Sequence, residues 1–286
     1  STSDSFTLKL SYRPPFDFSG LTSFLSMRAI PGVESVVEGE YRRLFRFEGE
    51  LGFLRVTDDE AARALCCKID MENSRLLVRV VEKVRRLFDL DAVPQDIESQ
   101  LKKDKPLFRL VSQNPGLRLP GAWDAFEIAV RAIVGQQVSV KGATTVMGRI
   151  AETYGQKVSK GIVFPGPENL ADIDPSSLPM PLNRANAIKL MAQAVLDGDL
   201  DLGSEYDSSI LVEQLVAIKG IGPWTAQYVV MRALNDPDAF LHNDLVLMKV
   251  AKEKLGIKTE KELLERAEKW RPWRAYAGMH LWRNAV

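Results

Sequence analysis

The residues with the clearest chemical potential lie in a short glycine-containing segment, residues 215–226, which separates two helical patterns. Gly220 and Gly222 allow a tight reversal of the chain and a close approach of another backbone. The amide N–H groups at the start of the second helix can bind a phosphate oxygen. We expect the Thr225 hydroxyl to contact the same phosphate and Ile221 to pack between the two helices. The alternative is an ordinary connection between two helices.

A carboxylate, Asp244, follows about twenty residues later, directly before an apolar helical run. An Asp at that position is by default the N-cap of the helix. A carboxylate that is used as a cap has less freedom to face a substrate, and Asn243 offers a second capping side chain. We therefore predict that Asn243 caps the helix and that Asp244 is free for chemistry.

Histidine and cysteine are too few for several kinds of site. The 286 residues contain two His and two Cys, and the cysteines are the neighbours Cys66 and Cys67. An iron–sulfur cluster or a Cys-only zinc site needs four thiolates, so both are excluded, as is a His-rich metalloenzyme. So few cysteines fit a reducing, intracellular compartment. We interpret His242 and His280 as surface or packing residues.

The charge balance at first argues against nucleic acid as a partner, because 38 basic and 38 acidic residues give a net charge of zero. The distribution is uneven, however. Residues 249–286 carry ten basic and five acidic side chains, a local charge of +5. DNA responds to that local field, so zero net charge does not exclude it and instead predicts few phosphate contacts and modest salt dependence.

Composition and length are those of a globular protein, with 45% hydrophobic and 27% charged residues. No run of about 18 apolar residues is present, so we expect no membrane-spanning helix. The first residues lack the pattern of a secretion signal. We expect an intracellular monomer, in the cytoplasm or nucleoid.

The first 110 or so residues are mixed α and β. Strand-like alternation or β-branched and aromatic character occurs at residues 6–12, 41–47 and 52–57, and residues 77–88 carry one apolar helical stripe. This order predicts an antiparallel sheet with helices on one face. Residues 114–121, with two Pro and two Gly, are typical of a linker.

After this linker the pattern is almost entirely helical, which makes the fold class α+β. We expect three units, residues 1–113, 114–236 and 237–286, the last two being helical subdomains. Helices are predicted near residues 126–134, 139–153, 183–197, 208–218, 223–234, 244–255, 260–270 and 272–283.

Several motifs together resemble the AlkA family of helix-hairpin-helix DNA glycosylases, the 3-methyladenine DNA glycosylases II. They are Leu-Arg-Leu-Pro-Gly at 117–121, Asp-Ala-Phe at 124–126, Val-Arg-Ala-Ile-Val-Gly-Gln at 130–136, Phe-Pro at 164–165, Trp-Thr-Ala at 224–226 and Lys-Trp-Arg-Pro-Trp-Arg at 269–274. The resemblance covers the whole chain. Relatives with lyase activity carry a lysine where this chain has Trp224, and endonuclease III relatives carry four C-terminal cysteines that are missing here. The resemblance therefore implies a glycosylase without lyase activity.

The resemblance also implies a mechanism and a set of site residues. The substrate would be duplex DNA with alkylated bases such as 3-methyladenine, whose N-glycosidic bond is hydrolysed after the base is flipped out. Asp244 would stabilise the sugar cation or orient water, and the base pocket would consist of Trp224, Tyr228 and Trp273. Trp273 can instead be a core residue of the last helix, and we assign Trp123 to packing.

By the same resemblance, DNA contacts come from Gly220, Gly222 and Thr225 of the hairpin and from Gln136 and Gln137. The family usually has an apolar wedge where this chain has Gln137, so a purely apolar wedge is in doubt, and Gln137 can also simply end its helix.

No cofactor is expected for catalysis. The carbonyls of Val216, Ile218 and Ile221 would hold a structural Na⁺ or K⁺. Arg274 and Arg283 either contact phosphate or lie on a solvated face.

Two alternatives remain. One is a related glycosylase for another lesion such as 8-oxoguanine, against which Trp224 argues. The other is a helix-hairpin-helix module that binds DNA without catalysis, which would need neither Asp244 nor the aromatic residues.

Overall fold

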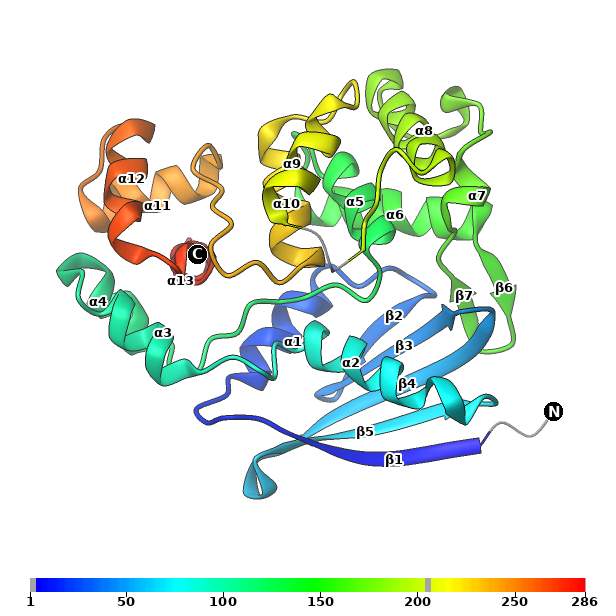
Figure 1. The fold of residues 1–286 in the computed structure, drawn as a ribbon, viewed down its shortest axis with the longest axis horizontal. Coiled ribbons are helices and arrows are strands. Elements are labelled where there is room, and N and C mark those ends of the chain that lie inside the picture. Colours follow the sequence, from blue (N-terminus) through cyan, green and yellow to red (C-terminus); the bar gives the residue numbers. More distant parts are fainter. Residues whose placement is uncertain (1–3, 204–206, 286) are drawn as a thin grey trace.

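The protein was analysed as a computed structural model that describes residues 4–203 and 207–285 (Figure 1). An antiparallel five-stranded sheet with the order β1-β5-β4-β3-β2 forms its N-terminal part. The strands are β1 (Asp4–Ser11), β2 (Glu34–Val37), β3 (Glu40–Phe47), β4 (Glu50–Asp59) and β5 (Ala64–Met71). The three predicted strands are confirmed as β1, β3 and β4, whereas β2 and β5 were not predicted.

Strand β5 carries the two cysteines. Its side chains alternate between the sheet faces, so Cys66 is half-buried while Cys67 is buried. Burial raises the pKa of the Cys67 thiol to about 12, which makes it an inert core residue.

One face of the sheet is covered by two helices, α1 (Phe18–Ser26) and α2 (Leu77–Leu87). Their apolar stripes pack into the same cluster as the inward side chains of β1, β3, β4 and β5. Trp123 belongs to this cluster, 4.6 Å from the ring of Phe45, which confirms its assignment to packing. The sheet is tied to the helical part by Arg43 of β3, whose Nη1 donates to Glu127 at 3.1 Å in a buried ion pair.

The rest of the chain is helical apart from a small hairpin of β6 (Gln156–Val158) and β7 (Gly161–Val163). The helical pattern predicted after residue 121 is confirmed, whereas α3, α4 and α7 were not predicted. The α-helices are α3 (Pro94–Leu101), α4 (Lys105–Gln113), α5 (Ala125–Val134), α6 (Val140–Tyr154), α7 (Pro167–Leu170), α8 (Leu182–Asp197), α9 (Ser208–Ala217), α10 (Pro223–Ala233), α11 (Leu245–Leu255), α12 (Glu260–Ala267) and α13 (Arg274–Arg283). Short 3₁₀ turns are η1 (Glu60–Ala62), η2 (Ser74–Leu76), η3 (Pro175–Ser177) and η4 (Glu268–Trp270).

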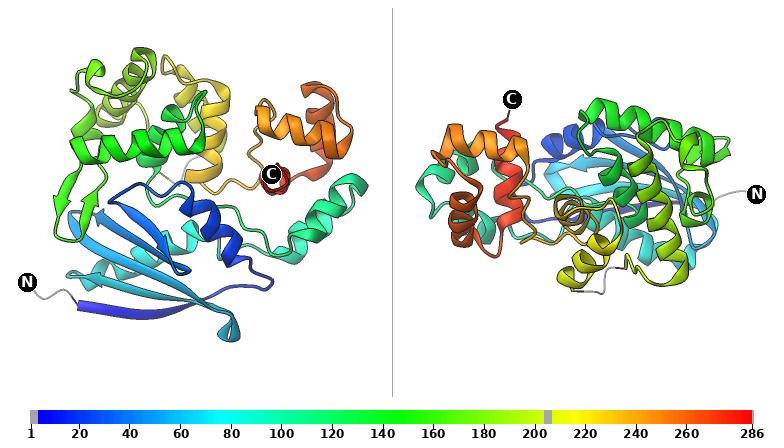
Figure 2. Two further views of the ribbon diagram at one scale, coloured as in Figure 1. Left: turned by 180° about the vertical axis from the view of Figure 1, so that it is seen from behind. Right: turned by 90° about the horizontal axis from the view of Figure 1, so that it is seen from above.

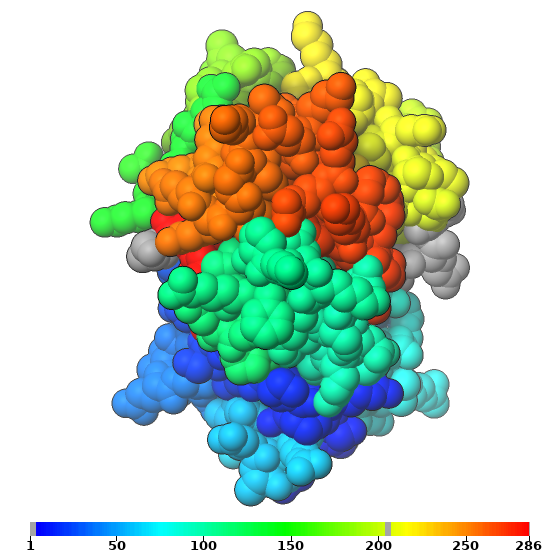
Figure 3. Space-filling model, turned by 90° about the vertical axis from the view of Figure 1, so that its left-hand side faces the viewer, coloured from blue at the N-terminus to red at the C-terminus, as the bar shows by residue number. Residues whose placement is uncertain are grey.

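The helices form two groups. Figure 2 shows α5–α10 on one side and α11–α13 on the other, with the chain after α10 running between them. Helices α3 and α4 contact α11, α13 and η4, and Figure 3 shows them between the C-terminal helices and the blue N-terminal part of the chain. Although they precede residue 113 in the sequence, their apolar faces share a core with the C-terminal helices.

A buried carboxylate joins α4 to the C-terminal group. Asp104 accepts hydrogen bonds from Arg266 at 2.6 and 2.7 Å and from the Trp270 indole at 2.8 Å. Because three N–H donors surround it, the pKa of Asp104 lies below its ordinary value although burial opposes the shift.

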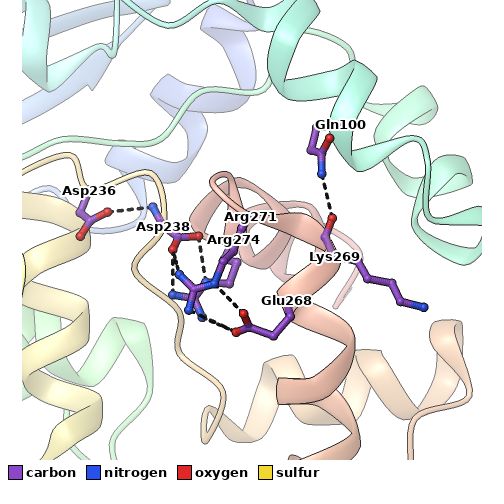
Figure 4. A network of polar contacts seen from close by, with 7 residues as sticks. All are labelled: Gln100, Asp236, Asp238, Glu268, Lys269, Arg271 and Arg274. Carbon is purple, nitrogen blue, oxygen red and sulfur yellow. Dashed lines mark hydrogen bonds and ion pairs between the residues drawn. The ribbon is translucent and has the colours of Figure 1, made fainter.

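A second polar network fixes the start of α13 (Figure 4). Arg274 donates to Asp238 at 2.8 and 2.9 Å, and Arg271 donates to Glu268 at 2.7 Å. Gln100 of α3 adds a hydrogen bond to the Lys269 carbonyl at 3.0 Å. Arg274 is therefore engaged within the protein and does not point freely toward a phosphate.

Among the residues described, every helix is too short or too polar to cross a bilayer.

Candidate active site

A cleft of about 1290 Å³ lies between the two groups of helices. Its walls come from α1, the turn after α5, the start of α10, the start of α11 and the end of α13. Residues far apart in the sequence, such as Phe24, Gln136, Trp224, Asp244 and Trp282, therefore meet in one cavity.

The hairpin between α9 and α10 forms one edge of the cleft, as the glycine spacing predicts. Gly220 has φ +97°, and a Cβ there would lie 2.9 Å from the Cβ of Ala187 on α8. Ile221 is 5% exposed and packs in the helical core, which confirms its predicted position. Gly222 is the N-cap of α10, which has no capping side chain, so the first amide groups of this helix have no side-chain acceptor.

Asp244 both caps α11 and faces the cleft, so the prediction that Asn243 would be the cap was wrong. One carboxylate oxygen, Oδ1, accepts the backbone N–H of Leu247 at 2.8 Å and the indole N–H of Trp282 at 3.0 Å. The other, Oδ2, accepts the indole N–H of Trp224 at 3.0 Å. A carboxylate has about four acceptor positions, so these three bonds fix its orientation and leave one position on Oδ2.

Two aromatic residues on α10 line the cleft next to this carboxylate. The rings of Trp224 and Tyr228 are stacked with centroids 5.4 Å apart and an interplanar angle of 13°. The third wall is Trp282, whose ring lies 6.5 Å from Tyr228. Together with Asp244 they make a pocket that is aromatic on its sides and negatively charged at one edge.

Trp273, the third predicted pocket residue, does not line the cleft. It precedes α13 and packs edge-to-face on Tyr276, with ring centroids 5.9 Å apart. The last helix thus presents the Trp at its C-terminal end to the cleft, and Trp282 is the residue that the sequence analysis missed. No local pattern distinguishes the two tryptophans, because only the packing of α13 decides which end faces the cavity.

Arginines surround the phenol of Tyr228. Arg232 donates to the phenol oxygen at 2.7 Å and to the carbonyls of Pro120 and Gly121, while Arg28 and Arg131 line the cleft nearby. Burial alone would raise the pKa of Tyr228, but the three guanidinium groups outweigh it and lower the pKa below its ordinary value.

The pKa of Arg28 is lowered to about 10, chiefly by burial. This group of three arginines around Tyr228 was not predicted, because its members lie far apart in the sequence.

The turn between α5 and α6 lies beside the hairpin, on the same side of the cleft. Gln137 lies exposed at its tip with φ +56°, past the end of α5. The side chain of Gln136 points to the hairpin, where its amide donates to the Gly220 carbonyl at 3.1 Å and to the Thr225 hydroxyl at 3.0 Å. Thr225 is 2% exposed, so its hydroxyl is directed to Gln136 and not toward a phosphate as predicted.

The two histidines are not among the residues that line the cleft. His280 is buried, which agrees with a packing role, and His242 lies 3.2 Å from Glu260. Arg283 pairs with Asp17 at the cleft edge. Within residues 4–203 and 207–285, His, Cys, Asp and Glu form no group of three that can hold a metal ion.

The chain matches two family descriptions that together span most of its length. Residues 7–124 match the AlkA N-terminal domain, and residues 130–274 match the HhH-GPD superfamily base excision DNA repair protein. The chain is similar to the DNA-3-methyladenine glycosylase 2 of Escherichia coli K12, with 36% identity over 96% of this chain and 95% of that protein.

It is also 39% identical, over 96% of its length, to the probable bifunctional transcriptional activator/DNA repair enzyme AlkA of Mycobacterium tuberculosis. There the chain spans only 56% of the relative's length.

Solved structures show the same fold at lower identity. The 3-methyladenine DNA-glycosylase from Archaeoglobus fulgidus superposes with a TM-score of 0.84 at 20% identity, over 98% of both chains. The apo 8-oxoguanine glycosylase/lyase of Clostridium acetobutylicum gives a TM-score of 0.75 at 17% identity, over 100% of this chain and 99% of that one. The α+β fold class and the resemblance found in the sequence are both confirmed. The chain belongs to the HhH-GPD superfamily of base excision DNA repair proteins and carries an AlkA N-terminal domain.

Proposed function

We propose that this protein is a monofunctional DNA glycosylase that hydrolyses the N-glycosidic bond of alkylated bases, such as 3-methyladenine, in duplex DNA. The observation that carries the proposal is the Asp244 carboxylate, held by Trp224, Trp282 and the amide of Leu247 at the edge of an aromatic pocket. A module that only binds DNA needs neither a carboxylate held at the edge of a pocket nor stacked aromatic rings in that pocket.

The pocket suits a base made cationic by alkylation. Such a base is attracted to the faces of Trp224 and Tyr228, by about 0.5–2 kcal/mol for each contact. Stacking accepts any flat base, so the substrate range is broad. An alkylated base also leaves more readily, so the protein has to supply only part of the rate acceleration.

The negative charge of Asp244 would balance the positive charge that develops on the sugar as the base departs. As the glycosidic bond breaks, the sugar becomes oxocarbenium-like, and a fixed carboxylate next to it lowers the energy of that state. The remaining acceptor position on Oδ2 suits either the sugar cation or the attacking water. Because its donors hold Asp244 in place before the reaction, little reorganisation is needed.

DNA contact is assigned to the hairpin and to the neighbouring turn between α5 and α6. At the hairpin, a Cβ on Gly222 would meet no atom within 4 Å, so the space beside this backbone is open to a phosphate oxygen. The uncapped amides at the start of α10 are the donors. In the turn beside the hairpin, the exposed side chain of Gln137 is our candidate for entering the stack that a flipped base vacates.

The lining of the same cavity supports the proposal that the protein has no lyase activity. A Schiff base with the abasic sugar needs an amine, and no lysine is found among the described residues that line the cleft. Trp224 fills the position where lyase relatives carry that amine.

A monovalent cation at the hairpin remains part of the proposal. Of the three carbonyls that would hold Na⁺ or K⁺, that of Ile218 already accepts the N–H of Ile221 at 3.0 Å and keeps one lone pair for a cation. Val216 belongs to the last turn of α9, where carbonyls have no partner within the helix. These free lone pairs support the proposal of such an ion, which would aid phosphate binding and play no part in bond cleavage. We further propose that the protein acts as a monomer, inside the cell where its DNA substrate lies.

The test is to incubate the protein with methylated duplex DNA and to separate the released bases by chromatography. We expect free 3-methyladenine, and strand scission only after the product is heated in alkali. Release of 8-oxoguanine from oxidised DNA instead would assign the protein to the other lesion. No release from either substrate would indicate a DNA-binding module, and nicking without alkali would show an unrecognised amine.

A further inference from the structure

The turn between α5 and α6, residues 135–139, is held in place by a side chain from outside it. Arg184 of α8 donates from Nη1 to the carbonyl of Val134 at 3.3 Å and to that of Gln136 at 2.6 Å. The first of these carbonyls belongs to the last turn of α5, where it has no partner within the helix. A guanidinium there satisfies it and complements the negative end of the helix dipole.

The same turn is fastened to the hairpin on its other side. The side-chain amide of Gln136 spans to the Gly220 carbonyl and the Thr225 hydroxyl at 3.1 and 3.0 Å. The backbone and the side chain of Gln136 are therefore both engaged, the first by Arg184 and the second by the hairpin.

Helix α8 closes this arrangement by contacting the hairpin directly. A Cβ at Gly220 would lie 2.9 Å from the Ala187 Cβ and 3.4 Å from the carbonyl of Asn183. Arg184 lies between these two residues in the sequence of α8. One helix thus supports both of these neighbouring segments, the hairpin by backbone packing and the 135–139 turn by Arg184.

We propose that Arg184 is a positioning residue that holds the 135–139 turn in register with the hairpin, so that phosphate binding and insertion of Gln137 into the duplex occur as one rigid movement. Gln137 itself adopts φ +56°, an unfavourable conformation for a residue other than glycine, which the fastened neighbours on its N-terminal side help to maintain. This inference rests on the proposed glycosylase function, since it assigns a role within the same site.

The inference separates two kinds of DNA substrate. Filling the vacated stack matters only when the base must leave an intact duplex, and much less when the base is already unpaired and unstacked. A lesion in a three-nucleotide bubble keeps duplex DNA on both sides for the hairpin but removes the need for a wedge. A general loss of folding would lower excision from both substrates alike.

The experiment compares Arg184→Met with Lys189→Met, which is a matched control because Lys189 lies on the same helix and donates to a backbone carbonyl, that of Ile173, at 3.1 Å. Single-turnover excision is measured on an alkylated base in a duplex and in the bubble. For Arg184→Met we expect the duplex rate to fall about 10- to 100-fold, the effect of a small misplacement, with the bubble rate within about twofold of wild type. Arg184→Lys, which can reach one carbonyl, should fall between, and Lys189→Met should match wild type.

Hydrogen–deuterium exchange of residues 135–139 in the DNA-free protein gives a readout that does not depend on catalysis. Exchange should be faster in Arg184→Met and unchanged in Lys189→Met. Equal losses on duplex and bubble, or unchanged exchange in Arg184→Met, would overturn the inference. If wild type released no base from either substrate, the proposed function would fail, and the exchange data would still decide whether Arg184 holds the turn.

Discussion

Substitutions at Asp244 should separate its role as a helix cap from its role as a charge. Asn keeps an oxygen that can accept the Leu247 N–H, and Asn is as good an N-cap as Asp. We therefore expect Asp244→Asn to change the free energy of unfolding by less than about 0.5 kcal/mol. The Trp224 indole then faces an amide NH₂, but it lies at the wall of an open cleft where water can replace the lost acceptor.

Asp244→Ala should behave differently. Losing the cap costs about 1 kcal/mol, with a range of about 0.5–2 kcal/mol. The indoles of Trp224 and Trp282 lose their acceptor as well, at a cost below the roughly 1–3 kcal/mol of a fully buried donor, because both rings are only partly buried. The sum is about 1–3 kcal/mol, enough to lower the melting temperature by several degrees.

The assay is thermal unfolding of wild type, Asp244→Asn and Asp244→Ala at one pH, followed by calorimetry. The reasoning requires Asn to resemble wild type and Ala to be destabilised. If Ala were as stable as wild type, the hydrogen bonds around Asp244 would contribute nothing. If Asn were as unstable as Ala, any loss of activity in that variant would report on folding as well as on charge.

Three further outcomes follow from the geometry. Trp282→Phe keeps a ring at the pocket wall but removes a donor to the Asp244 carboxylate, so single-turnover base release should fall about tenfold or more. Trp273→Phe, outside the cleft, should release base at the wild-type rate. Gly220→Ala should lower the melting temperature and weaken binding of undamaged duplex in a filter assay, because φ +97° and the 2.9 Å approach to Ala187 both oppose a Cβ. Unchanged affinity for the duplex would show that the hairpin does not bind a phosphate. Burial, aided by nearby positive charge, lowers the pKa of His280 from 6.5 to about 3. Below pH 6.5 the unfolded chain therefore binds a proton at His280 that the folded protein does not bind, and stability falls as the pH falls. Urea unfolding should show wild type losing about 2 kcal/mol relative to His280→Leu between pH 7.5 and pH 5, and a constant difference would refute the neutral buried imidazole.

The sequence predicted features that depend on local chemistry. The glycines of the hairpin and the buried Ile221 lie where their spacing indicates. The helical patterns match α5, α6 and α8 to α13 closely. Strand β1 was visible from its alternation, and β3 and β4 from their aromatic and β-branched residues. Strand β5 was overlooked, although its buried residues Cys67, Ile69 and Met71 alternate with polar ones.

Features that depend on how helices pack could not be predicted. The choice between Trp273 and Trp282 is made by the orientation of α13. The arginines around Tyr228, namely Arg28, Arg131 and Arg232, come from three distant parts of the chain. The cap prediction failed for a different reason. It treated the two oxygens of Asp244 as one acceptor, whereas the structure uses Oδ1 for the cap and leaves Oδ2 to the pocket.

The most direct test of the central claim is the single-turnover rate of base release from methylated duplex DNA by Asp244→Asn, measured beside wild type at saturating protein. The substitution keeps the cap and the pocket and removes only the charge. We predict a rate at least about 100- to 1,000-fold below wild type, as expected for the loss of a fixed electrostatic group in a catalytic site. Release at the wild-type rate by a correctly folded Asp244→Asn protein would contradict the assignment of Asp244 as the catalytic residue.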